Sequence, residues 1–268
     1  MINLSKSLNV TSISCYNNLE GSLPVFVGFA GLEFLDLSHN RLSGAIDLEL
    51  DVLVGLRSLN LSLNNFTGSV PTRLGKSKVL KELQLSMNKF HGIILGLLIL
   101  WVTKLEVLIL SSNSLSGEIP QSLSNITGLT RFAANSNKFN GPIPAGITKH
   151  LRNLDLSYYS LSGSISSDLL SPLNLQTVDL SNNRLNGSIP TALSPRLVRL
   201  RLGSNSLDYV IPTAAIATHQ HLTYLDLENN TLTGLISPEL GSCQSLELLN
   251  LAQNQLSGSL PVELAGIL

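Results

Sequence analysis

The stretch that decides the fold of this chain is residues 105–120, which read Leu-Glu-Val-Leu-Ile-Leu-Ser-Ser-Asn-Ser-Leu-Ser-Gly-Glu-Ile-Pro. Its pattern, L-x-x-L-x-L-x-x-N-x-L-x-G-x-I-P, returns along nearly the whole chain of 268 residues. The Asn of the pattern stands at positions 40, 64, 88, 113, 137, 183, 205, 230 and 254, and Tyr159 takes its place between positions 137 and 183. A recurring period of this length predicts a solenoid in which each repeat packs on its neighbours.

Each part of the repeat has a physical reason. The alternation of Leu35 and Leu37 predicts a half-buried strand, and copies of that strand pair in a parallel sheet about 4.8 Å apart. The Asn turns the chain, and its amide can bond the backbone of the turn, so stacked copies predict a buried Asn ladder. The Gly four positions later permits a tight backbone path, and Ile-Pro leads the chain to the convex side.

The fold class that follows is an α/β repeat solenoid. We expect a right-handed superhelix with a concave parallel β-sheet, an irregular or 3-10 convex side and about ten to eleven repeats. One solenoid is predicted over residues 1–268, with full repeats over about 32–268 and an imperfect repeat over about 8–31. We expect it to be uncapped at both ends. Cys15 and Cys243 lie about nine rungs, or about 40 Å, apart, whereas a disulfide needs Cα atoms within about 7 Å.

Composition and motifs exclude several functions. The formal net charge of −1 gives no reason to expect nucleic acid as a partner. The longest apolar run, 93–102, is too short for the roughly 18 residues of a membrane span. No nucleophile elbow accompanies the many Ser residues, and His219 and His221 lack a metal-ligand spacing. The sequence therefore predicts a protein that is not an enzyme and that has no cofactor and no metal site.

The repeat resembles the plant extracellular type of leucine-rich repeat. Its plant mark, L-x-G-x-I-P, is complete at 115–120 and 185–190, and the resemblance covers roughly residues 8–268. The resemblance implies the ectodomain of a receptor-like kinase or receptor-like protein, extracellular and glycosylated, that binds a peptide, steroid or protein ligand with a possible co-receptor. No signal peptide is recognised in this segment. The alternative is an apoplastic inhibitor similar to polygalacturonase-inhibiting proteins, although those carry Cys caps. An ice-binding or adhesive role fits less well, because charged and aromatic residues interrupt any flat Asn or Thr array.

Residues that point outward from the predicted strands form a ribbon where solenoids usually bind. One patch on it is apolar, with Met87, Val107 and Ile109 at its centre and Leu63 and Ala133 beside them. Such a patch could hold an apolar part of a ligand, but scattered exposed apolar residues are also common. The apolar segment 92–103 is a second candidate interface, or a helix that buries most of its side chains.

A second feature of the ribbon is the pair Arg199 and Arg201 on one predicted strand. Plant peptide receptors use a similar R-x-R to hold a carboxylate, for which Arg is suited by its two parallel hydrogen bonds. The neighbouring candidate ligand-binding residues are Tyr158, Asn182, Tyr224 and Glu228. Two interpretations stay open, because Asp179 and Asp226 flank Arg201 in its own column and could neutralise it instead.

Departures from the repeat and glycosylation motifs complete the sequence predictions. Tyr159 replaces the ladder Asn and Tyr209 replaces the motif Gly, so we predict a local distortion at each, whether by neutral drift or for contact with a ligand. Among the N-x-S/T sequons, Asn125 and Asn186 are the predicted glycosylation sites. A glycan at Asn60 would obstruct the concave ribbon.

Overall fold

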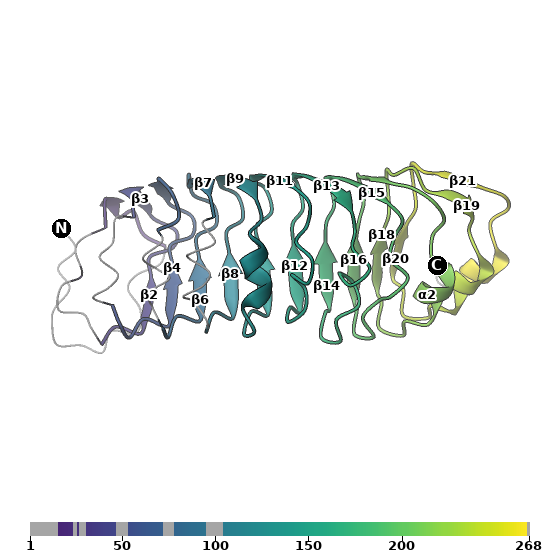
Figure 1. Cartoon of the computed structure of the whole chain (residues 1–268), viewed down its shortest axis with the longest axis horizontal. Coiled ribbons are helices and arrows are strands. Elements are labelled where there is room, and N and C mark those ends of the chain that lie inside the picture. Colours follow the sequence, from purple (N-terminus) through teal and green to yellow (C-terminus); the bar gives the residue numbers. More distant parts are fainter. Residues whose placement is uncertain are drawn as a thin grey trace. The chain divides into compact units, whose positions relative to one another are not determined.

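The computed structural model describes residues 16–23, 26, 31–46, 53–71, 78–94 and 104–266 (Figure 1). The chain divides into two compact units, Met1–Phe139 and Asn140–Leu268, and each is a stack of repeating turns. Cys15 and most of the apolar segment, including Leu97, Ile99 and Trp101, lie outside the described residues. The expectation of one continuous solenoid stays a prediction.

Three-residue strands form the main parallel sheet of each unit, as the Leu alternation predicts. The middle residue of each strand points into the core, and its two flanking residues point outward. In the first unit the strands are β2 (Phe34–Asp36), β4 (Ser58–Asn60), β6 (Glu82–Gln84), β8 (Val107–Ile109) and β10 (Arg131–Ala133). In the second unit they are β12 (Asn153–Asp155), β14 (Thr177–Asp179), β16 (Arg199–Arg201), β18 (Tyr224–Asp226) and β20 (Leu248–Asn250).

A second set of short parallel strands follows the ladder Asn in each repeat, and the sequence did not predict it. In the first unit these are β1 (Glu20–Gly21), β3 (Arg41–Ala45), β5 (Asn65–Thr67), β7 (His91–Ile93) and β9 (Ser114–Glu118). The pattern continues in the second unit with β13 (Ser160–Ser164), β15 (Arg184–Gly187), β17 (Ser206–Leu207), β19 (Thr233–Leu235) and β21 (Gln255–Ser257). A further strand of this set, β11 (Lys138–Gly141), pairs with β13 through Asn140 and Gly141.

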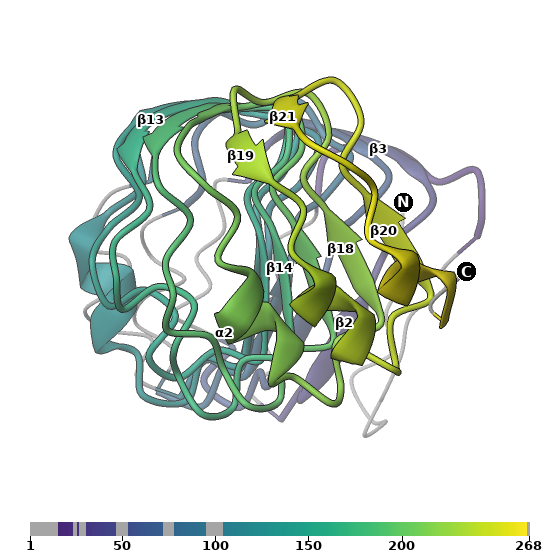
Figure 2. The same ribbon diagram turned by 90° about the vertical axis from the view of Figure 1, so that its right-hand side faces the viewer.

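Short helical turns lie between the strands of successive repeats, and three of the four in the described residues are 3-10 helices, as predicted. They are η3 (Gln121–Asn125) in the first unit and α2 (Thr213–Ala217), η4 (Pro238–Ser242) and η5 (Val262–Gly266) in the second. Figure 2 shows α2 on the opposite side of the second unit from β19 and β21. Among the described residues no helix is long and apolar enough to cross a bilayer.

The core of each unit is built mainly from the motif Leu residues, together with Ile, Phe and Val. In the second unit Leu154, Leu180, Leu200 and Leu225 are buried at successive strands and turns. Burial of one such side chain stabilises the fold by about 2 kcal/mol, so the repeated Leu is the main source of stability. Phe66 and Phe90 extend this packing in the first unit, where their ring centroids lie 6.4 Å apart.

The Asn ladder predicted from the sequence is present and joins each turn to the one before it. Asn205 is representative. Its Nδ2 donates to the carbonyl of Leu202 in its own turn and to that of Leu180 in the preceding turn, both at 3.0 Å. Its Oδ1 accepts the backbone N–H of Leu185 at 3.0 Å. Backbone groups that the tight turn would leave without partners are thereby satisfied.

The two Tyr departures behave differently. A distortion at Tyr159 was predicted and is wrong for the backbone, because the N–H of Tyr159 donates to Asn182 O as the equivalent N–H of Asn183 does to Ser204 O. At Tyr209 the prediction is confirmed. Tyr209 keeps the positive φ of the motif Gly, at 64°, but β17 shrinks to two residues. An isolated bridge between Val210 and Thr233 takes the place of a regular strand pair, and the N–H of Thr231 donates to Leu207 O.

Candidate ligand-binding face

The outward side chains of the main sheet in the second unit form a polar surface, which we call the Arg199 face. Parallel register sets these side chains in two columns, with neighbouring strands about 4.8 Å apart. The first column holds Asn153, Thr177, Arg199, Tyr224 and Leu248, and the second holds Asp155, Asp179, Arg201, Asp226 and Asn250. The strands lie in sequence order, so each side chain meets the equivalent one from the adjacent repeat.

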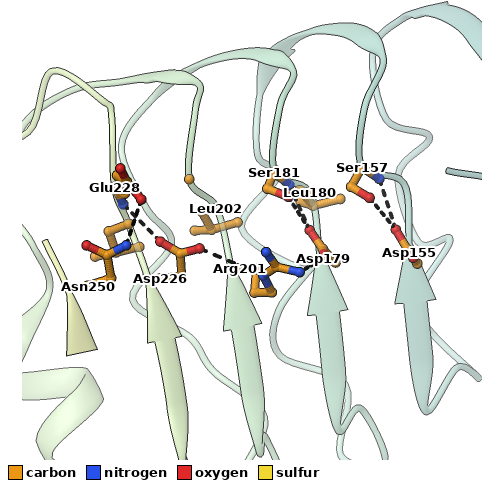
Figure 3. Close-up of polar contacts among 12 residues, drawn as sticks. Asp155, Ser157, Asp179, Leu180, Ser181, Arg201, Leu202, Asp226, Glu228 and Asn250 are labelled. Atoms are coloured by element: carbon orange, nitrogen blue, oxygen red, sulfur yellow. Dashed lines mark hydrogen bonds and ion pairs between the residues drawn. The ribbon is translucent and has the colours of Figure 1, made fainter. Parts of the chain in front are cut away.

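Arg201 is held by carboxylates on both sides (Figure 3). Its Nη1 lies 2.9 Å from Asp179 Oδ2, and its Nε lies 3.7 Å from Asp226 Oδ2. Burial on its own lowers the pKa of Arg201, but attraction to Asp179, and less to Tyr224 and Asp226, raises it overall. The geometry therefore agrees with the neutralised interpretation of Arg201, in which its charge is already used inside the protein.

Arg199 differs from Arg201 although both lie on β16. Its side chain is exposed, and its guanidinium carbon lies 4.9 Å from the ring centroid of Tyr224. The guanidinium of Arg201 approaches the same ring at 5.8 Å. Within the described part of the chain no carboxylate lies within ion-pairing distance of Arg199. A cation held over an aromatic ring keeps its outward N–H groups available for an anion.

The Asp and Asn residues of the second column, and those at the same strand position in the first unit, have a structural role that sequence reasoning missed. Each of them accepts the backbone N–H two residues further along the chain and so closes the turn that follows the strand. The pairs are Asp36 with Ser38, Asn60 with Ser62, Asp155 with Ser157, Asp179 with Ser181, Asp226 with Glu228, and Asn250 with Ala252. The recurrence of Asp or Asn four residues before the ladder Asn was the available signal.

Asp155 has no cationic partner in the part of the chain that the structure describes. Its Oδ1 accepts the N–H and the hydroxyl of Ser157 at 3.1 and 2.8 Å, as Figure 3 shows. Burial is the largest influence on its pKa and raises it. The hydrogen bonds from Ser157 and the charge of Arg201 oppose this effect, and the nearby charge of Asp179 adds to it. The direct contacts of Asp155 in the described part of the chain are therefore with neutral donors.

The structure brings together only some of the other predicted site residues. Tyr224 lies beside Arg199. Glu228 is turned toward β20, where its carboxylate accepts Asn250 Nδ2 at 2.7 Å (Figure 3). Tyr158 is 58% exposed and lies in the turn after β12, two strands from Arg199. Asn182 lies in the corresponding turn after β14, and both residues have the positive φ of that position.

The apolar patch of the first unit is narrower than the sequence suggested. Val107 and Ile109 point outward from β8 and are half-buried, and Met87 is 53% exposed. Ala133 is buried and contributes little surface. Register places the charged Glu82 and Arg131 on either side of Val107, so the patch has polar borders.

A pocket at one end of the first unit was not predicted. Its volume is about 500 Å³. The rings of Tyr16 and His39 stack in its lining with centroids 3.9 Å apart. The remaining lining residues are Asn17, Asn18, Asn40, Arg41 and Leu63. Its rings and amides make it a second polar and aromatic surface.

The sequons differ in accessibility. Asn125, at the end of η3, and Asn186, on β15, are exposed, and their glycosylation stays a prediction. Both ends of the Asn60 side-chain amide are engaged in hydrogen bonds. Its Nδ2 donates to Asp36 Oδ2 at 3.2 Å, and its Oδ1 accepts the backbone N–H of Ser62.

Comparison with known proteins agrees with the repeat. Two family profiles, each described as leucine rich repeat, match residues 195–257 and residues 31–53, 55–77, 104–126 and 174–195, which together make up more than half of the chain. The chain therefore belongs to the leucine-rich-repeat family. The matching profiles describe a repeat and not a catalytic domain.

Individual relatives are plant proteins with the same repeat. Over 54 residues, 20% of this chain and 5% of the relative, it is 43% identical to the leucine-rich repeat receptor-like serine/threonine-protein kinase RGI4 of Arabidopsis thaliana. A crystal structure of PEPR1–AtPEP1 matches with a TM-score of 0.85 and 31% identity over 97% of this chain and 40% of that one.

Two further structures extend the comparison. One is the Arabidopsis receptor kinase HAESA in complex with the peptide hormone IDA and the co-receptor SERK1, with a TM-score of 0.80 and 34% identity over 94% of this chain and 46% of that one. The other is a plant ice-binding protein, with a TM-score of 0.79 and 28% identity over 91% of this chain and 79% of that one. The chain spans less than half the length of the PEPR1 and HAESA chains.

Proposed function

We propose that this chain is a ligand-binding, non-catalytic segment of the extracellular part of a plant receptor-like kinase or receptor-like protein, and that it binds a peptide or protein on the Arg199 face. The observation that carries the proposal is the state of Arg199. Its guanidinium is exposed, lies over the ring of Tyr224 and has no carboxylate partner among the described residues. Such a group suits the carboxylate of a ligand.

Arg199 and Arg201 have different roles in this proposal. Arg199 contacts the ligand directly, with Tyr224 holding its guanidinium. Arg201 acts as a positioning residue, because it is bound to Asp179 and Asp226 and approaches the same Tyr ring. Asn182 and Tyr158 extend the face toward β12, and Glu228 borders it toward β20.

The receptor relatives support this proposal. Among the similar structures, HAESA is in complex with a peptide hormone and a co-receptor. By analogy, the ligand here is a secreted peptide or protein, and a co-receptor joins the complex. The apolar patch of Met87, Val107 and Ile109 is proposed as a separate contact for an apolar part of a ligand.

The similarity to an ice-binding protein points to a different use of the same fold. Ice binding requires a flat array of similar small polar groups. The first column of the Arg199 face instead reads Asn, Thr, Arg, Tyr and Leu on successive strands, and its side chains differ in size and charge. The irregular column favours recognition of a molecule with specific chemistry.

A binding screen tests the function. Secreted plant peptides with free C-termini, each paired with its C-terminally amidated form, are screened by calorimetry against the chain. A peptide that binds is then measured against Arg199→Ala. Loss of a charge-assisted hydrogen bond costs about 1.5–3 kcal/mol, so we expect affinity to fall roughly tenfold to hundredfold.

The matched control is Arg184→Ala, which removes an exposed Arg of the same unit from β15, outside the Arg199 face. It should leave affinity within about twofold of the unchanged chain, because a distant exposed charge contributes little. Equal binding of the acid and amide forms, or undiminished affinity of Arg199→Ala, would show that the Arg199 face does not hold a carboxylate.

A further inference from the structure

Several charges of the Arg199 face remain without an ion pair once the internal contacts are counted. Arg201 is paired with Asp179 and Asp226, and this group keeps one negative charge in excess. Outside it, the described part of the face holds the cation of Arg199 and the carboxylates of Asp155 and Glu228. Both carboxylates accept neutral hydrogen bonds, Asp155 from Ser157 and Glu228 from Asn250, but Glu228 is turned toward β20, whereas Asp155 lies on β12, on the other side of β16.

From this distribution we infer that the face recognises a peptide with two charges, the C-terminal carboxylate at Arg199 and a basic side chain at Asp155. The inference rests on the proposed function, and it adds the chemical class and spacing of the ligand. Charge complementarity of this kind sets specificity and orientation more than total affinity.

The distance between the Cα atoms of Arg199 and Asp155 follows from the geometry of the sheet. β12 and β16 are separated by β14, so two strand spacings, about 9.6 Å, lie between them. Asn153 on β12 is level with Arg199 on β16, and Asp155 lies two residues further along β12. These two residues add about 6.8 Å along the strand direction. The two Cα atoms are therefore about 12 Å apart. An extended peptide advances about 3.4 Å per residue, which places the basic residue about three positions before the C-terminal residue.

The surface between the two charges is compatible with such a path. Asn153 and Thr177 lie next to it and bond to each other, with Asn153 Nδ2 donating to Thr177 Oγ1 at 2.7 Å. On β14 the path passes between Thr177, which is neutral, and Asp179, whose carboxylate is already bound to Arg201. Tyr158, in the turn after Asp155, is 58% exposed and offers its ring to the aliphatic stem or the cation of a basic side chain.

The charge of Asp155 can be removed without removing its structural hydrogen bond. Asn60 and Asn250 occupy the equivalent position in other repeats, and each accepts the N–H two residues later at 3.1 and 3.2 Å. Asp155→Asn therefore keeps the turn closed and changes only the charge. Asp36→Asn is the matched control, because Asp36 bonds Ser38 in the same way and lies in the first unit.

The experiment uses fluorescein-labelled nonapeptides of Gly, Ala and Ser with a free C-terminus and a single Lys, which is moved through the positions before the C-terminal residue. Binding is measured by fluorescence anisotropy. We expect the tightest binding with Lys three positions before the C-terminal residue, about tenfold tighter than with Lys six positions before it. Asp155→Asn should reduce that preference to less than about twofold, and Asp36→Asn should leave it unchanged.

A charge reversal gives an independent measurement. Asp155→Lys should bind a peptide with Glu three positions before the C-terminal residue better than the corresponding Lys peptide. Binding that depends on the free C-terminus but not on the Lys position would overturn this inference and leave the proposed function standing. The inference would also be overturned if Glu228→Gln, rather than Asp155→Asn, abolished the preference for one Lys position. If amidated peptides bind as well as free acids, the proposed function itself fails.

Discussion

At the scale of single residues, one position of the repeat carries most of the specificity for the fold. The ladder Asn occupies a site in which both ends of its amide bond the backbone. Asn205 bonds Leu180, Leu202 and Leu185, and so connects two turns of the second unit. No other short side chain offers a donor and an acceptor in this arrangement.

This geometry predicts the effect of Asn205→Ala. The substitution leaves the backbone N–H of Leu185 without its acceptor, which costs about 1–3 kcal/mol. It also removes one of the two amide donors from each of Leu180 O and Leu202 O, which keep Asn183 and Asn230, and each lost hydrogen bond costs about 1 kcal/mol. We expect the free energy of unfolding, measured by urea denaturation, to fall by about 3 kcal/mol. Asn186→Ala, an exposed Asn of the same unit, serves as the control in protein made without glycans. Equal stability of the two variants would show that the ladder is not stabilising.

A substitution at Tyr209 is expected to have the opposite effect, because any side chain at this position strains the backbone and lowers the stability of the protein. Its φ of 64° is a conformation that costs a non-Gly residue about 1–2 kcal/mol. The ring is 65% exposed and contributes little burial in return. Tyr209→Gly should therefore raise the thermal midpoint, with a gain in stability of about 1 kcal/mol, as measured by calorimetry. A lower midpoint would mean that the Tyr ring makes a contact worth more than the backbone strain.

At the scale of elements, the three-residue strands are stable only because each one adds to a sheet and turns one apolar side chain, usually a Leu, into the core. Leu200 is the buried middle residue of β16, between the two Arg residues of the face. The packing of this one side chain consequently fixes where both guanidinium groups project. Fold and site are coupled here by a single position.

Leu200→Ala tests that coupling. Removal of a buried Leu side chain costs about 2–5 kcal/mol, and the loss should be felt mainly by adjacent turns. We expect hydrogen exchange to accelerate in β14, β16 and β18, with little change in β4 and β6. Leu173→Ala is the control, because Leu173 is 72% exposed. Uniform acceleration throughout the described strands would contradict a nearest-neighbour origin of stability.

At the scale of the molecule, both units use the same repeat, but they present different surfaces. The main sheet of the first unit carries the half-buried Val107 and Ile109, whereas that of the second unit carries the Arg199 face. Because the inward Leu positions fix the fold, the outward positions are free to vary from repeat to repeat. The recognition chemistry is thereby separated from the chemistry that holds the stack together.

The sequence by itself determined the repeat, the strands of the main sheet, the Leu core and the Asn ladder. All of these depend on interactions that recur at one fixed spacing along the chain, so a single pattern reveals them. It also placed Arg199, Arg201 and Tyr224 on one surface, because alternation along a strand sets the direction of each side chain.

Only the tertiary structure decided which charged side chains form ion pairs within the protein and which remain available to a ligand. That Arg201 lies between Asp179 and Asp226 while Arg199 lies over Tyr224 depends on side-chain rotamers across three strands, and residue spacing does not specify rotamers. The second set of strands, from β1 to β21, was also missed. Its hydrogen bonds form between neighbouring repeats, and its segments have little apolar alternation of their own.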